Sequence, residues 1–140
     1  MKMKTIVTGV IGMDAHIVGN RILQRVLERE GFKVVPLGAL TPPAEFIKAA
    51  VETDADAIVI SSLYGHAEID CQGFRDKCIE AGLQDILLYI GGNLSVGRSD
   101  FNKTKKIFSD MGFNRVYPPD VKLESFISDI KNDLEISSES

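Results

Sequence analysis

The sequence predicts an α/β protein built around a doubly wound parallel sheet. β-Branched runs of a few residues alternate with longer amphipathic stretches, and glycine or proline separates most of them. This alternation is typical of parallel strands that are joined by crossover helices. The chain has 140 residues, of which 44% are apolar and 26% are charged, so it matches one domain with a sizeable core.

The first half of the chain contains three predicted strands and two predicted helices. Residues 4–9 form a β-branched run, and an amphipathic helix over residues 17–30 follows it and ends at a glycine. Residues 33–36 form a short strand, and the prolines at 42–43 suit the first turn of the second helix. Residues 57–61 are typical of a central strand buried on both faces. The side chains expected to face the core from the two helices are Ile22, Leu23, Val26, Leu27, Phe46, Ile47, Ala50 and Val51.

The second half of the chain repeats the alternation. A helix is expected over residues 69–81, where a glycine ends it, and a strand over residues 86–90. A helix over residues 101–111 leads to a short strand at 113–117, and a last helix is expected over residues 123–134. Five strands therefore alternate with five helices.

For a sheet of this size the natural strand order is the flavodoxin-like 2-1-3-4-5, with a switch point between the first and third strands. Three loops then meet at the carboxyl edge of the sheet, at residues 12–19, 61–66 and 91–97. Open parallel sheets bind their ligands at this edge, so we expect the functional site there. The domain is expected to span residues 1–136, and residues 137–140 are expected to form a disordered tail.

The first of these loops carries Asp14 and His16. Side chains two residues apart in an extended segment point the same way, so the carboxylate can accept a hydrogen bond from one ring nitrogen of the imidazole. The other nitrogen is then free to bind a metal, because the carboxylate fixes the tautomer. A local hydrogen bond without a metal is the commoner meaning of such a pair.

The other two loops are ambiguous when each is taken alone. Ser61 and Ser62 could satisfy backbone groups at the end of a strand, and the adjacent glycines Gly91 and Gly92 could form a tight turn. Two glycines also allow a flat or bulky group to approach the backbone. A long ligand that crosses the edge of the sheet would use all three loops.

Composition excludes several classes of partner and location. The net charge of −4 and the sequence pI of about 5.2 argue against a nucleic acid or an anionic membrane as partner. No signal sequence or membrane-spanning run is evident, so a soluble, cytoplasmic protein is expected. Cys71 and Cys78 would lie roughly 10 Å apart along a helix, too far for a disulfide, and are expected to be reduced core thiols.

Taken together, the three loops resemble the DxHxxG…SxL…GG fingerprint of cobalamin-binding domains that bind the cofactor base-off and histidine-on. The resemblance implies that His16 is the lower axial cobalt ligand and that Asp14 orients it. Gly19 would leave room beside the nucleotide tail, and Ser61 and Leu63 would contact the displaced base. The remaining residues that the resemblance places against the cofactor are Met13, Ala15, Ile17, Ser62, Gly91, Gly92, Asn93, Leu94, Ser95, Val96 and Gly97.

Almost the whole chain is similar to the small, cobalamin-binding components of glutamate mutases. The resemblance implies adenosylcobalamin as cofactor and the radical isomerisation of L-glutamate to L-threo-3-methylaspartate. It also implies a larger barrel-type catalytic (epsilon) subunit that holds the substrate, with two copies of each chain. This chain would hold the cofactor and supply no catalytic residue of its own.

Several other classes of protein share either this fold or this cofactor. A receiver domain needs an aspartate at the end of the third strand, where this chain has Ser61 and Ser62, and a flavodoxin needs a hydroxyl-rich loop after the first strand. A subunit of another mutase, a methyl-transfer corrinoid carrier and a cobalamin sensor keep the cofactor but change the chemistry. Methyl carriers usually add a helical bundle before the first strand, and only three residues precede Lys4.

Overall fold

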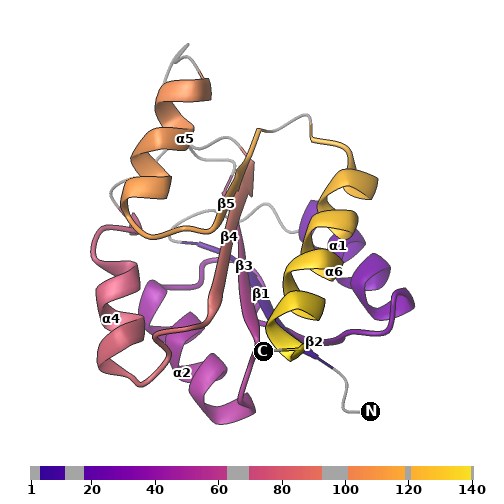
Figure 1. Cartoon of the computed structure of the whole chain (residues 1–140), viewed down its shortest axis with the longest axis horizontal. Coiled ribbons are helices and arrows are strands. Elements are labelled where there is room, and N and C mark those ends of the chain that lie inside the picture. The colour runs from indigo at the N-terminus through magenta and orange to yellow at the C-terminus, as the bar shows by residue number, and fades with distance from the viewer. Residues whose placement is uncertain (1–3, 12–17, 63–69, 93–100, 119–120, 140) are drawn as a thin grey trace.

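The computed structural model describes residues 4–11, 18–62, 70–92, 101–118 and 121–139 (Figure 1). The five strands of these residues form one parallel sheet. In chain order they are β1 (Thr5–Val10), β2 (Lys33–Pro36), β3 (Ala57–Ser62), β4 (Leu87–Gly92) and β5 (Arg115–Tyr117). The strand order across the sheet is β2-β1-β3-β4-β5, and every neighbouring pair is parallel. The predicted doubly wound, flavodoxin-like topology is confirmed.

Helices cover both faces of the sheet. One face is covered by α1 (Val18–Arg29) and α6 (Leu123–Glu139), and the other by α2 (Pro43–Thr53), α4 (Phe74–Glu80) and α5 (Phe101–Asp110) (Figure 1). In the described part of the chain, no helix is both long and apolar enough to span a membrane. The two layers divide the core into two clusters.

The cluster under α2, α4 and α5 is rich in aromatic rings. Phe46 of α2 packs edge-on against Phe74 of α4, with ring centroids 6.3 Å apart. Phe108 of α5 meets Phe113 in the same way at 5.9 Å. These rings cover Ile58 and other alternate residues of the strands, because side chains two apart in a strand share one face.

The cluster under α1 and α6 contains the other alternate residues of the strands. Ile6, Val59 and Tyr89 are fully or almost fully buried on this face. The side chains that cover them come from both helices and include Leu27, Phe126, Ile127, Ile130 and Leu134. Thr8 lies on the same face, between Ile6 and Val10 along β1.

The structure corrects some of the predicted boundaries. The helix expected over residues 69–81 is not continuous, because Gly73 has a left-handed φ of 73° and α4 begins only at Phe74. At the other end of the chain, α6 continues to Glu139, beyond the expected end at Leu134. No glycine or proline follows Leu134 within the helix to end it.

Two side chains that were expected in the core are exposed. Ile22 of α1 is 54% exposed and Val51 of α2 is 50% exposed. Both lie at the border of the apolar stripe of an amphipathic helix, where periodicity alone does not decide whether the side chain reaches the sheet. Cys71 and Cys78 are both free and buried, as expected for core thiols.

Candidate functional site

The described ends of β1, β3 and β4 lie side by side at the carboxyl edge of the sheet. Val10 pairs with Ser61, and Ser61 pairs with Gly91 on its other side. Ser62 pairs in turn with Gly92. The serines and glycines that were predicted to form part of one site are therefore brought together.

The remaining predicted site residues can be placed only in part. Gly19 lies in the first turn of α1, directly after the first of the three loops. Ile11 precedes that loop, and its amide donates a 3.1 Å hydrogen bond to the Ser61 carbonyl. The predicted residues that lie outside the described part of the chain are Met13, Asp14, Ala15, His16, Ile17, Leu63, Asn93, Leu94, Ser95, Val96 and Gly97.

Gly92 is required by the sheet itself. Its φ of 104° lies in the left-handed region, and a Cβ added there would collide with the carbonyl oxygen of Ser62. Gly91 is less restricted, since an added Cβ would lie 3.3 Å from Cβ of Tyr117. At Gly92 the group that approaches the backbone closely is thus a neighbouring strand, which the sequence alone could not distinguish from a ligand.

A further segment that sequence reasoning missed reaches the same edge. The amide of Val10 donates to the carbonyl of Gly38 at 2.8 Å, and the amide of Thr41 donates to the carbonyl of Val10 at 2.9 Å. The Thr41 hydroxyl closes the turn by donating to the Gly38 carbonyl at 3.0 Å. These bonds hold Leu40 at a φ of 57° with its side chain 53% exposed. A left-handed leucine has no sequence signal.

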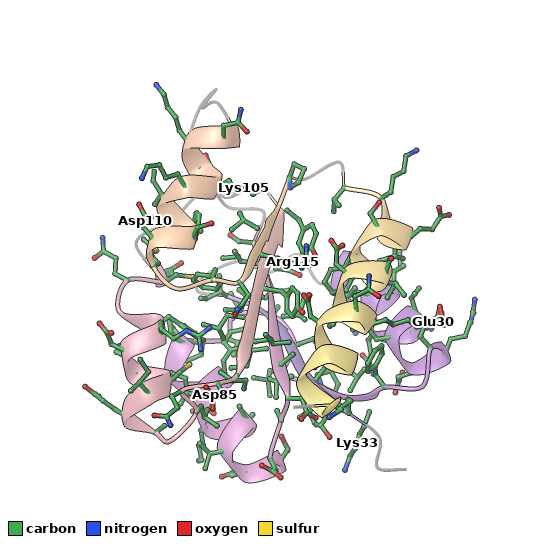
Figure 2. All side chains as sticks on the ribbon, in the orientation of Figure 1. Glu30, Lys33, Asp85, Lys105, Asp110 and Arg115 are labelled. Carbon is green, nitrogen blue, oxygen red and sulfur yellow. The ribbon has the colours of Figure 1, made fainter. Side chains whose placement is uncertain are left out.

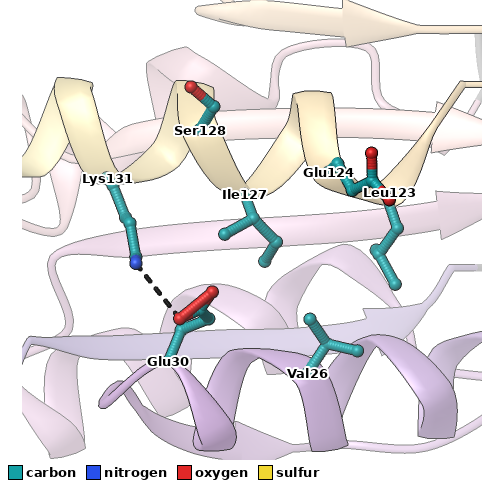
Figure 3. A pocket seen from close by; sticks show the side chains of 7 residues that line it. All are labelled: Val26, Glu30, Leu123, Glu124, Ile127, Ser128 and Lys131. Atoms are coloured by element: carbon teal, nitrogen blue, oxygen red, sulfur yellow. Dashed lines mark hydrogen bonds and ion pairs between the residues drawn. The ribbon is translucent and has the colours of Figure 1, made fainter.

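A groove of about 490 Å³ opens between α1 and α6 (Figure 3). Val26 lines it from α1, and Leu123 and Ile127 line it from α6. Near one end an ion pair crosses the groove, in which Nζ of Lys131 lies 3.1 Å from Oε2 of Glu30. The groove lies over the sheet face that carries Thr8, because both helices pack on that face.

Three side chains of the sheet hold α6 over β4 and β5. Tyr89 donates to Oδ2 of Asp133 at 2.7 Å, and Tyr117 donates to Oδ2 of Asp129 at 2.9 Å. Arg115 binds Asp133 through two nitrogens at 2.7 and 2.9 Å and lies 3.5 Å from Asp129. Figure 2 labels Arg115 on the side of the sheet that faces α6. One wall of the groove is therefore anchored to the sheet by charged hydrogen bonds.

These contacts change the acidity of the groups that make them. Hydrogen bonds from Arg115 and then Tyr89 lower the pKa of Asp133, although partial burial opposes them. Burial, followed by the hydrogen bond to Asp133, raises the pKa of Tyr89. For Tyr117 burial again comes first, and the hydrogen bond to Asp129 adds to it, so that its pKa is also raised. All of these groups keep their ordinary charges near neutral pH.

Thr8 is the polar exception on this face. It is 0% exposed, and its Oγ1 is the one buried side-chain nitrogen or oxygen without a hydrogen-bond partner among the described residues. It pairs with Val59 on β3, two residue pairs deeper in the sheet than Val10 and Ser61. Toward the edge, the side chains on this face become small, from Val59 and Tyr89 to Ser61 and Gly91.

The described residues contain no group of three or more His, Cys, Asp or Glu side chains that could hold a metal ion. His16 and Asp14 would supply one imidazole and its carboxylate partner, which suits a metal that already has most of its ligands from a cofactor. The neighbouring small residues and the apolar side chains of the groove, Val26, Leu123 and Ile127, suit the organic part of such a cofactor.

Comparison with known proteins assigns the family. A family model described as the B12 binding domain matches residues 4–109. The chain belongs to this family of B12-binding domains.

Relatives of nearly the same length narrow the assignment. The chain is 56% identical over 136 residues to the glutamate mutase sigma subunit of Clostridium cochlearium, across 97% of this chain and 99% of that protein. It is 53% identical to the sigma subunit of Fusobacterium nucleatum, across 97% of this chain and 100% of that protein. Within the B12-binding family, the chain belongs with the glutamate mutase sigma subunits, as its resemblance predicted.

A solved structure supports the fold. A cobalamin-binding protein from Desulfitobacterium hafniense superposes with a TM-score of 0.67 at 22% identity, over 82% of this chain and 53% of that chain. At this identity the likeness concerns the fold alone. The shared architecture agrees with the sheet order and the helix layers described above.

Proposed function

We propose that this chain is the adenosylcobalamin-binding subunit of a glutamate mutase. The observation that carries the proposal is the 56% identity to a glutamate mutase sigma subunit over 97% of the chain. The reaction is the reversible isomerisation of L-glutamate to L-threo-3-methylaspartate. Bound adenosylcobalamin supplies a carbon-centred radical through homolysis of its cobalt–carbon bond.

The first loop would hold the metal. His16 would be the lower axial ligand of cobalt, and Asp14 would accept a hydrogen bond from the second ring nitrogen of His16. A neutral imidazole with a fixed tautomer is a good donor to a cobalt ion that is already bound by a corrin. The other residues of the loops that would contact the cofactor are Met13, Ala15, Ile17, Leu63, Asn93, Leu94, Ser95, Val96 and Gly97.

The displaced nucleotide tail would enter between α1 and α6. Ser61 and Gly91 have small side chains or none, so they leave space at this edge of the sheet. Gly19 lies in the first turn of the helix that forms one wall. The exposed Ile22 lies one turn before Val26, so the apolar surface of α1 continues from the groove toward the edge. Ser62 and Gly92 would keep the neighbouring strand ends in register below the corrin.

The substrate site would belong to a larger partner subunit of the barrel type, with two copies of each chain in the assembly. The arginines Arg21, Arg25 and Arg29 are exposed along α1, and Arg115 is bound to carboxylates of α6. None of these four forms a cluster that would suit a dicarboxylic acid.

A cytoplasmic location is the remaining part of the proposal. Cys71 and Cys78 are buried as free thiols. Burial raises the pKa of Cys71 to about 12 and that of Cys78 to about 11, so both stay protonated at neutral pH. Such thiols suit a reducing compartment.

Cobalamin titration tests the proposal directly. The purified protein is titrated with cobalamin, and the Co(II) form is studied by electron paramagnetic resonance after labelling of histidine with nitrogen-15. We expect hyperfine splitting from one histidine nitrogen, which His16→Gly removes. His66→Gly is the matched control, because His66 is the only other histidine of the chain.

Two results would contradict the proposal. The cofactor assignment fails if cobalamin does not bind, or if the spectrum is the same with and without His16. The mutase assignment fails separately if the cobalamin-loaded chain, mixed with the epsilon subunit of a glutamate mutase, gives no methylaspartate from glutamate.

A further inference from the structure

The buried hydroxyl of Thr8 has no partner in the described part of the chain, although it is 0% exposed. A buried hydroxyl that makes no hydrogen bond destabilises a folded protein, since it loses its bonds to water and gains nothing in return. Native proteins contain few such groups, and a bound molecule often satisfies them. Thr8 is therefore a candidate for a contact with a ligand.

The position of Thr8 relates it to one particular site. It lies on the sheet face beneath α1 and α6, in the row between Ile6 and Val10. Its partner across the sheet is Val59, whereas Ser61 pairs with Val10 two residues nearer the edge on the same face. A molecule that enters over Ser61 and extends inward between the helices would meet Thr8 with its inner end.

The charges on this face restrict the chemistry of that inner end. Arg115 is paired with Asp129 and Asp133, and Lys131 is paired with Glu30. Of the described residues that line the groove or the network, no cation is left to compensate a buried phosphate. The inner end should be neutral and should carry a hydrogen-bond acceptor.

We propose that the Thr8 hydroxyl donates a hydrogen bond to the ring nitrogen of the cofactor's dimethylbenzimidazole base. This inference rests on the proposed function, in which His16 displaces that base from cobalt. Of the two ring nitrogens, one carries the ribose, and the other then has a free lone pair and no proton, so it can only accept. Ser61 would contact the outer part of the same tail.

The substitution Thr8→Val tests the inference, because valine keeps the shape of threonine and removes the hydroxyl. Affinity for cobalamin and for cobinamide, which lacks the nucleotide tail, is measured by spectroscopic titration, and the stability of the ligand-free protein by thermal unfolding. We expect Thr8→Val to weaken cobalamin binding roughly fivefold to tenfold. Cobinamide binding should not change, and the melting temperature of the ligand-free protein should rise.

Two further variants complete the test. Thr8→Ser retains the hydroxyl and should bind cobalamin within about twofold of the wild type. Thr5→Val makes the same change in β1, at the amino end of the strand and on the opposite face, and should leave both affinities unchanged.

The outcomes separate this inference from the proposed function. If wild-type protein binds cobalamin through His16 and Thr8→Val binds it equally well, the inference is wrong and the proposed function stands. Equal losses for cobalamin and cobinamide would also overturn the inference, since they indicate a general distortion. If the wild type binds no cobalamin, both the inference about Thr8 and the proposed function are wrong.

Discussion

Tyr89 and Arg115 donate to the same oxygen of Asp133, each at 2.7 Å. Two neighbouring strands, β4 and β5, thereby hold one carboxylate of the C-terminal helix. A carboxylate that accepts from both a phenol and a guanidinium is held more firmly than by a neutral bond. This contact fixes the side of the groove that is formed by α6.

The substitution Tyr89→Phe should destabilise the protein by about 1.5 kcal/mol, the lower part of the range for hydrogen bonds to charged groups. The ring stays in place and Arg115 still compensates Asp133, so the loss should not be larger. Urea unfolding followed by circular dichroism measures it. Tyr117→Phe is the parallel variant, because Tyr117 makes the equivalent bond to Asp129. An unchanged midpoint for both would contradict the role assigned to these bonds.

Asp133 should make the stability depend on pH. Its pKa is lowered in the folded protein, so its contribution is fully present above the ordinary value of 3.8 and is lost as the pH falls below it. We expect Asp133→Asn to be less stable than the wild type at pH 7, with a difference that shrinks below about pH 4. Chemical unfolding between pH 3 and 7 measures this. Asp110→Asn changes an exposed ion pair and should show little difference at any pH.

Gly92 should tolerate no side chain. Gly92→Ala brings a methyl group against the Ser62 carbonyl and also disfavours the φ of 104°, so we expect a loss of about 3 kcal/mol or more. Gly82→Ala is the control, because Gly82 has a φ of 86° and nothing lies within 4 Å of an added Cβ. It should cost only about 1 kcal/mol. Equal losses in thermal or urea unfolding would show that φ alone sets the cost at Gly92.

The ion pair between Glu30 and Lys131 should contribute little to stability. Its side chains are 38% and 42% exposed, and solvent screens such pairs. A double-mutant cycle with Glu30→Gln and Lys131→Met should give a coupling energy below about 1 kcal/mol. The coupling should fall further in 0.5 M salt. A larger, salt-independent value would mean that the pair fixes the distance between α1 and α6.

The fold could be predicted from the sequence because the patterns that indicate strands and helices are local. The apolar runs at residues 4–9, 57–61 and 86–90 predict the central strands to within two residues of their observed ends, and the spacing of apolar residues predicts the helices between them. The topology follows, since parallel strands need crossovers of one hand. The fingerprint identified the family for the same reason, since within each of the three loops its residues lie within a few positions of one another.

Contacts between distant residues could not be predicted in this way. Tyr89 and Asp133 are 44 residues apart, and neither is part of a recognisable motif. The exposure of Ile22 depends on how α1 packs on the sheet, and the break at Gly73 depends on one backbone angle. In the sequence Thr8 is an ordinary strand residue. Only the packing of the described residues shows that its hydroxyl is buried and makes no hydrogen bond with them.

The position of α6 after all five strands in the sequence has a consequence for synthesis. Phe126, Ile130 and Leu134 cover the sheet face formed by strands made much earlier, among them β1 with Ile6. A nascent chain that has emerged through β5 therefore presents to solvent the part of this apolar face that α6 covers, while α1 covers the rest. That face and its groove are completed only when α6 leaves the ribosome, so a chain cut short before α6 would aggregate rather than take up a ligand.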